Sequence, residues 1–149
     1  MTPDLPSNLG FKLLHVGVAV NSLSETAKLL SALFGYRVIS GPFYDPIQKV
    51  KVKFLTRSDD DTVEIELIEP TAKDSPVGNI LKKGGGAYHF CFATIDLEAA
   101  VEHARVNGCI LVSGPVPAVA FGGRRIAWIY TPARQLVELV EHATSIPAA

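Results

Sequence analysis

Runs of alternating apolar and polar residues divide the chain into short strands and helices. Val50, Val52 and Phe54 alternate with lysines, which is typical of a strand with one buried face and one solvated face. The same pattern predicts strands at residues 13–20, 37–41, 49–56, 62–69, 88–94, 109–113, 124–130 and 135–141. Helices are predicted at about residues 24–34 and 96–107, where alanine and leucine follow a polar N-cap residue.

The two halves of the chain repeat one pattern in the same order. Residues 15–20 (HVGVAV) match residues 89–94 (HFCFAT), since each is an apolar run that opens with histidine. Residues 65–69 (IELIE) match residues 137–141 (VELVE) in the same way. The histidine and the first glutamate of each pair are separated by 51 residues in the first half and 49 in the second. Matches in the same order and at similar spacing indicate two related modules.

Helix boundary signals support the same repeat. Ser22 and Asp96 are suited to be N-cap residues, and Gly35 and Gly108 stand where each helix would end in a left-handed conformation. We therefore predict an α+β fold of two βαβββ modules joined by a loop and a short helix, at about residues 10–70 and 86–143. Neither module can bury both its helix and its sheet at this size, so the 149 residues are expected to form one domain.

Four residues at equivalent positions of the repeat have side chains that bind metals: His15, Glu66, His89 and Glu138. Alternation along a strand turns each glutamate to the face opposite its apolar neighbours, where an unpaired carboxylate would be costly to bury. Any one of the four alone is better explained as a hydrogen-bonded structural residue. If an approximate two-fold relates the modules, two imidazoles and two carboxylates converge, a set suited to Zn²⁺, Co²⁺, Ni²⁺, Fe²⁺ or Mn²⁺.

Composition argues against several other classes of protein. With 14 basic and 15 acidic residues, the net charge of −1 argues against nucleic-acid binding through a basic surface. No run approaches the roughly 18 apolar residues of a membrane span, and residues 1–6 lack the features of a secretion signal. Cys91 and Cys109 form neither a CxxC motif nor a disulfide framework. We expect a cytoplasmic protein that binds a small molecule.

The order His, Glu, His, Glu on paired βαβββ modules resembles the vicinal oxygen chelate superfamily. This superfamily includes glyoxalase I, extradiol dioxygenases, antibiotic-resistance proteins and methylmalonyl-CoA epimerase. Several segments are similar to the epimerase branch: IQKVKVKFL at 47–55, VEIELIEP at 63–70, DSPV at 74–77, ILKKGGG at 80–86 and FGGRRI at 121–126. The resemblance implies a curved, barrel-like mixed sheet around a metal site, and a homodimer.

The resemblance also assigns roles to particular residues. It implies a divalent metal held by His15, Glu66, His89 and Glu138, and a malonyl-type thioester whose enolate the metal stabilises as a Lewis acid. Glu138 is then a candidate acid–base group. Gln48 and Arg125 would bind substrate, although Arg125 fits a surface position on an edge strand equally well.

Two departures from the epimerase pattern affect the expected chemistry. Tyr88 stands where epimerases commonly have a second histidine, and Val52 stands where some have a second glutamate. The same four ligand types would serve a glyoxalase I-like lyase acting on a thiohemiacetal. A non-catalytic, resistance-type binding protein is a further alternative, but such members generally lack the metal ligands. Glu64 and Glu69 are expected to be solvated, and Glu141 is placed outside the ligand set.

Overall fold

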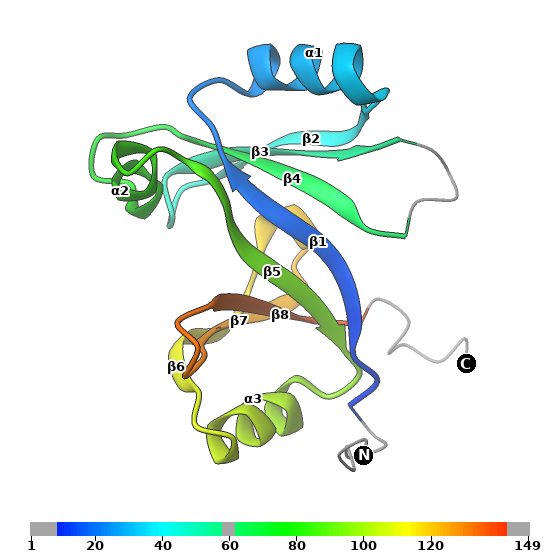
Figure 1. Cartoon of the computed structure of the whole chain (residues 1–149). Coiled ribbons are helices and arrows are strands. Elements are labelled where there is room, and N and C mark those ends of the chain that lie inside the picture. Colours follow the sequence, from blue (N-terminus) through cyan, green and yellow to red (C-terminus); the bar gives the residue numbers. More distant parts are fainter. Residues whose placement is uncertain (1–8, 58–61, 143–149) are drawn as a thin grey trace. The chain divides into compact units, whose positions relative to one another are not determined.

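The computed structural model describes residues 9–57 and 62–142, so the N-terminal segment examined for a secretion signal lies outside the described part. The order of elements repeats along the chain (Figure 1). The first repeat consists of β1 (Lys12–Ala19), α1 (Leu23–Phe34), β2 (Arg37–Asp45), β3 (Val50–Thr56) and β4 (Glu64–Pro70). After α2 (Pro76–Lys82), the second consists of β5 (Gly86–Thr94), α3 (Leu97–Val106), β6 (Ile110–Pro117), β7 (Arg125–Tyr130) and β8 (Leu136–Glu141). The predicted α+β class and both βαβββ modules are confirmed.

The predicted N-cap residues begin both helices and Gly35 ends α1, whereas the C-cap of α3 is Asn107, one residue before the predicted Gly108. The Ser22 hydroxyl accepts a hydrogen bond from the backbone N–H of Glu25 at 3.2 Å, and the Asp96 carboxylate accepts one from Ala99 at 3.0 Å. Gly35 ends α1 in the left-handed conformation, with φ of 79°. Each bond satisfies a backbone donor that the first helical turn leaves without a partner.

The chain divides into two compact units, and the boundaries fall inside β1 and β5. One unit runs from Leu14 to Phe90 and contains β2, β3, β4 and β1 in that spatial order, followed by the first half of β5. β1 is parallel to β4, and the other pairs among β2, β3 and β4 are antiparallel. α1 covers one face of this sheet (Figure 1), and the core between them includes Leu23, Leu55 and Leu67.

The other unit contains residues up to Leu13 and from Cys91 onward. Here β7 lies between β6 and β8 in antiparallel pairing, and α3 packs on one face. The buried core consists of Leu9, Leu97, Ala100, Ala127, Ile129, Val137 and Leu139. A single domain of 149 residues stays a prediction.

Two strands are longer than predicted, and the reason is the same in both. β2 and β6 continue through Ser40-Gly41-Pro42 and Ser113-Gly114-Pro115, with irregular register on either side. A side chain at Gly41 would lie 2.6 Å from the Val52 carbonyl oxygen, and one at Gly114 would lie 2.4 Å from that of Ile126. Glycine and proline normally indicate the end of a strand, but here they form a bulge inside one.

Within the two described stretches, no helix has the length and apolar character needed to cross a membrane.

Candidate metal centre

His15 and Glu66 lie on neighbouring parallel strands and face the same side of the sheet. In the pairing of β1 with β4, His15 is beside Glu64 and Gly17 is beside Glu66. Ile65 and Leu67 pack toward α1, so the alternation of the strand turns Glu66 to the opposite face of the sheet. His15 is 1% exposed and Glu66 is 6% exposed. A polar pair is therefore buried on the face of the sheet opposite α1.

His89 joins this pair because β1 has no side chain at the point where the two meet. A Cβ atom added to Gly17 would lie 1.9 Å from Cε1 and 2.2 Å from Nδ1 of His89. The imidazole therefore lies directly over the backbone of Gly17. His89 is 3% exposed, and its Nε2 lies 3.2 Å from Nε2 of His15.

The three side chains bring two imidazole nitrogens and one carboxylate oxygen to a common point. Glu66 Oε1 lies 3.1 Å from His15 Nε2 and 3.3 Å from His89 Nε2. Donors about 2.1 Å from one ion are about 3.0 Å apart in octahedral geometry and about 3.4 Å apart in tetrahedral geometry. The observed separations fall in this range, and the donor set suits a divalent transition metal. The geometry therefore fits the predicted ion.

The histidines change the acidity of Glu66. Burial alone would raise the pKa of the Glu66 carboxyl, but the hydrogen bonds and charges of His15 and His89 outweigh it and lower that pKa to about 2. Glu66 is thus an ionised carboxylate at neutral pH. Metal ligands need this form, because a protonated carboxyl competes with the ion for its oxygen.

β3 gives the centre an apolar wall. Phe54 stands directly opposite Glu66 in the antiparallel pairing, and its ring centroid is 5.4 Å from that of His15. Val50 and Val52 alternate onto the same face as Phe54, and all three are at least 95% buried. Val52, a residue that departs from the epimerase pattern, is therefore part of a buried apolar surface beside His15 and Glu66.

The fourth predicted ligand, Glu138, lies on β8 in the other compact unit. Its neighbours Val137 and Leu139 pack in the core under α3, so alternation turns Glu138 to the opposite face, where it is 4% exposed. It stands directly opposite Trp128 of β7, as Glu66 stands opposite Phe54. All four predicted ligands are therefore buried, and the place of Glu138 in one ligand set stays a prediction.

Gln48 lies in the turn between β2 and β3. Asp45 Oδ1 accepts hydrogen bonds from the backbone N–H groups of Ile47 and Gln48, and the Gln48 carbonyl accepts one from the Ser75 hydroxyl at 3.0 Å. The turn is therefore fixed on both sides. Contact of Gln48 with substrate stays a prediction.

Arg125 begins β7 and is engaged by two carboxylates. Its guanidinium donates to Glu98 at 2.6 and 2.9 Å and to Glu141 at 2.6 and 2.9 Å. Hydrogen bonds from Arg125 hold the pKa of both carboxyls below the ordinary value. Binding of substrate by Arg125 stays a prediction, since these bonds use four of the five N–H donors of its guanidinium.

Sequence reasoning missed the roles of three glutamates. Glu64 is two residues from Glu66 on the same face, and partial burial raises the pKa of its carboxyl. Glu69 accepts a hydrogen bond from the backbone N–H of Leu23 at 2.8 Å, at the start of α1. The expectation that Glu64 and Glu69 are solvated is therefore wrong, whereas Glu141, which was placed outside the ligand set, pairs with Arg125. For Glu64, the spacing of two residues from Glu66 indicates its position, because alternate residues of a strand share a face.

A buried His, Glu, His cluster on a repeated βαβββ fold defines a class of metal-chelating proteins, and the family comparison agrees. The family model of the Glyoxalase/Bleomycin resistance protein/Dioxygenase superfamily matches residues 14–128. The chain belongs to this superfamily, as the sequence resemblance predicted.

The similar proteins within this superfamily include methylmalonyl-CoA epimerases. The chain is 30% identical over 134 residues to the mitochondrial methylmalonyl-CoA epimerase of Dictyostelium discoideum, covering 87% of this chain and 78% of the relative. The crystal structure of methylmalonyl-CoA epimerase from Mycobacterium tuberculosis matches with a TM-score of 0.77 and 26% identity, over 92% of this chain and 91% of that one. A Streptomyces coelicolor methylmalonyl-CoA epimerase variant in complex with 2-nitronate-propionyl-CoA matches with a TM-score of 0.73 and 30% identity, over 88% and 96%. The predicted glyoxalase-like fold is confirmed.

Proposed function

We propose that the chain is a metal-dependent epimerase that inverts the α-carbon of a malonyl-type coenzyme A thioester. The observation that carries this proposal is the buried convergence of His15, Glu66 and His89 in a chain whose relatives include methylmalonyl-CoA epimerases. The alternative of a non-catalytic binding protein does not account for three ligating side chains buried together.

His15, Glu66, His89 and Glu138 would hold the metal, with Co²⁺, Zn²⁺, Ni²⁺, Fe²⁺ and Mn²⁺ as the candidate ions. When bound, such an ion supplies Lewis-acid stabilisation of the negative charge that develops on the substrate oxygens. The protein's own contribution is to keep Glu66 ionised and to hold both imidazoles in place.

In the proposed reaction, the Glu138 carboxylate takes the proton from the carbon between the two carbonyl groups. The resulting enolate is planar at this carbon, so a proton donated by water to the opposite face inverts the centre, and Glu138 then releases the first proton to solvent. Val50, Val52 and Phe54 exclude water from the β3 side, which strengthens electrostatic stabilisation of the enolate.

Deuterium exchange tests this function directly. Methylmalonyl-CoA is incubated in D₂O with the chelator-treated protein, then with the protein to which Co²⁺ or Zn²⁺ has been restored, and the α-proton is followed by NMR. We expect metal-dependent exchange that is lost in Glu138→Gln. Failure of the metal-loaded protein to exchange the proton would contradict the proposal.

A lyase acting on a thiohemiacetal is the second candidate, because the two-histidine, two-glutamate set is the one that the resemblance gives for glyoxalase I. Consumption of methylglyoxal with glutathione by the metal-loaded protein, without exchange of the thioester proton, would favour this candidate.

We also propose that the enzyme is a cytoplasmic homodimer. Edge strand β6 supports the dimer, because Ile110 is 65% exposed and Val112 is 56% exposed. Analytical ultracentrifugation should give twice the 16.0 kDa mass of the chain. A single species at the mass of the chain would contradict the dimer.

A further inference from the structure

Glu64 is the first residue of β4, and the proposed chemistry gives it no role. In the parallel pairing of β1 with β4, Glu64 stands beside His15, and Glu66 stands beside Gly17. Residues paired across neighbouring strands share a face of the sheet, as do alternate residues of one strand. Glu64, His15 and Glu66 therefore project from the same side, and a second carboxylate stands next to the candidate metal ligands.

Glu64 is set back from the point where the donor atoms meet. Glu66 Oε1 lies within 3.3 Å of Nε2 of both histidines, and two residues of strand, about 6.6 Å, separate Glu66 from Glu64. Glu64 is half-buried, whereas Glu66 is buried. Within the described residues, Glu64 is not among the side chains whose donor atoms converge. Its position suits a charge close to the ion rather than a ligand of the ion.

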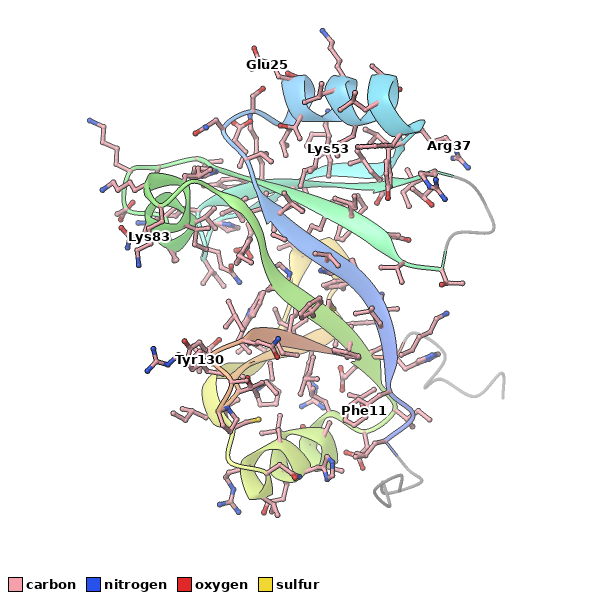
Figure 2. The ribbon with its side chains drawn as sticks, viewed as in Figure 1. Phe11, Glu25, Arg37, Lys53, Lys83 and Tyr130 are labelled. Atoms are coloured by element: carbon pink, nitrogen blue, oxygen red, sulfur yellow. The ribbon has the colours of Figure 1, made fainter. Side chains whose placement is uncertain are left out.

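Glu64 has no lysine or arginine partner in the described part of the chain. Its carboxylate forms no ion pair there, and the charges that act on it are those of His15 and Glu66. The lysines of neighbouring β3 face the other side of the sheet. Lys53 stands opposite Leu67, which packs in the core with α1, and Figure 2 shows Lys53 on the α1 side of the sheet. The negative charge of Glu64 is therefore available to a cation at the metal centre.

The metal-free protein holds this carboxylate in unfavourable surroundings. Partial burial and the charge of Glu66 raise the pKa of the Glu64 carboxyl, and the attraction of His15 does not outweigh them. A divalent cation beside Glu66 reverses this balance, because it attracts the Glu64 charge over a distance of about 7 Å. The same charge is thus unfavourable without the ion and favourable with it.

We propose that Glu64 is a further residue of the metal centre, which does not ligate the ion but raises the affinity for it through its negative charge. This inference rests on the metal centre of the proposed function, and it does not depend on the reaction catalysed. One unit charge about 7 Å from a divalent ion, at a dielectric constant close to that of water, changes the affinity by about five- to tenfold.

Calorimetric titration of the chelator-treated protein with Zn²⁺ tests the role of this charge. We expect the Kd for Zn²⁺ to rise about five- to tenfold in Glu64→Gln, which keeps the shape of the side chain and removes its charge. Glu64→Asp keeps the charge, so its Kd should stay within about twofold of wild type. Glu25→Gln changes an exposed glutamate of α1, labelled in Figure 2, and is the matched control that should bind Zn²⁺ as wild type does.

Ionic strength separates a charge effect from a structural effect. In about 1 M potassium nitrate the screening length is about 3 Å, so the difference in Kd between wild type and Glu64→Gln should shrink to about twofold. Urea unfolding of the metal-free Glu64→Gln protein should show no loss of stability. A difference in Kd that is the same at low and high salt, or that Glu64→Asp does not restore, would overturn the proposal. A clear loss of metal-free stability would show a structural role instead.

The α-proton exchange of wild type is measured separately, so this inference and the proposed function can fail independently. Zn²⁺ affinity that depends on the Glu64 charge, in a wild-type protein that exchanges no α-proton, would support this inference and overturn the epimerase. Equal Zn²⁺ affinity of wild type and Glu64→Gln would overturn this inference alone. Failure of wild type to bind Zn²⁺ would overturn both.

Discussion

The His89 imidazole occupies the space directly above the backbone of Gly17, where even a methyl group would lie 1.9 Å from the ring. The position of one predicted metal ligand therefore depends on the absence of a side chain on the neighbouring strand. Since His15 Nε2 is 3.2 Å from His89 Nε2, a displacement of the ring changes the separation of two donors.

Gly17→Ala should disrupt the centre without removing a ligand. We expect Zn²⁺ affinity to fall roughly 10–100-fold, as when a residue that orients a ligand is changed, and the free energy of unfolding to fall by about 1–3 kcal/mol. Calorimetric metal titration and urea unfolding measure the two effects. Gly78→Ala is the matched control, because its Cβ would meet only the Lys73 carbonyl oxygen at 3.6 Å. Wild-type zinc affinity in Gly17→Ala would contradict the dependence of His89 on Gly17.

Metal binding should stabilise the fold through Glu66. Zn²⁺ at about 100 times its Kd is expected to raise the free energy of unfolding by about 2.7 kcal/mol, and a chelator should reverse this. Glu66→Gln should lose the metal-dependent increase. Glu69→Gln, on the same strand but bonded to Leu23 at the start of α1, should keep it. Thermal unfolding of each variant with and without Zn²⁺ measures the effect. If both variants lose the metal-dependent increase equally, Glu66 is not a specific ligand.

Arg125→Gln should change the acidity of two carboxyls. Hydrogen bonds from Arg125 lower the folded-state pKa of Glu98 and Glu141 below the ordinary value of 4.5. The ionised pairs therefore stabilise the fold above about pH 4.5, and this contribution is lost as pH falls through the lowered pKa values. In the variant, ¹³C NMR of the side-chain carboxyls should show both pKa values rising. The stability gap between wild type and variant should be wider at pH 7 than at pH 3.

The control for this prediction is Arg105→Gln, which removes the partner of Glu102 on α3. It should raise the pKa of Glu102 and leave Glu98 and Glu141 unchanged. Unchanged carboxyl pKa values in Arg125→Gln would mean that Arg125 does not hold these carboxylates in solution.

The repeat and the candidate ligands could be predicted from the sequence because local signals determine them. Ser22 and Asp96 cap helices through bonds that span three residues, and strand alternation alone turns Glu66 away from Ile65 and Leu67.

Features that depend on contacts between distant segments could not be predicted in this way. The continuation of β2 past Gly41 depends on close approach to β3, and the ion pairs of Arg125 join residues 16 and 27 positions apart. The bond between Ser75 and Gln48 spans 27 positions and carries no local signal.

The only tryptophan of the chain can report on the fourth predicted ligand. Trp128 stands directly opposite Glu138 in the pairing of β7 with β8, so the two side chains project from the same face at a short distance. If Glu138 binds the metal with His15, Glu66 and His89, Co²⁺ should strongly quench Trp128 emission. Zn²⁺ has a filled d shell, so it should cause no such quenching and should compete with Co²⁺ for the site.

Glu138→Gln should weaken Co²⁺ binding at least about tenfold, and the quenching curve should shift to higher Co²⁺ by the same factor. Glu102→Gln, an exposed glutamate of α3, is the control and should follow the wild-type curve. Tight calorimetric Co²⁺ binding without any change in Trp128 emission would contradict ligation by Glu138. The ion would then be held by the three side chains on β1, β4 and β5 alone, and the proposed acid–base role of Glu138 would lose its basis.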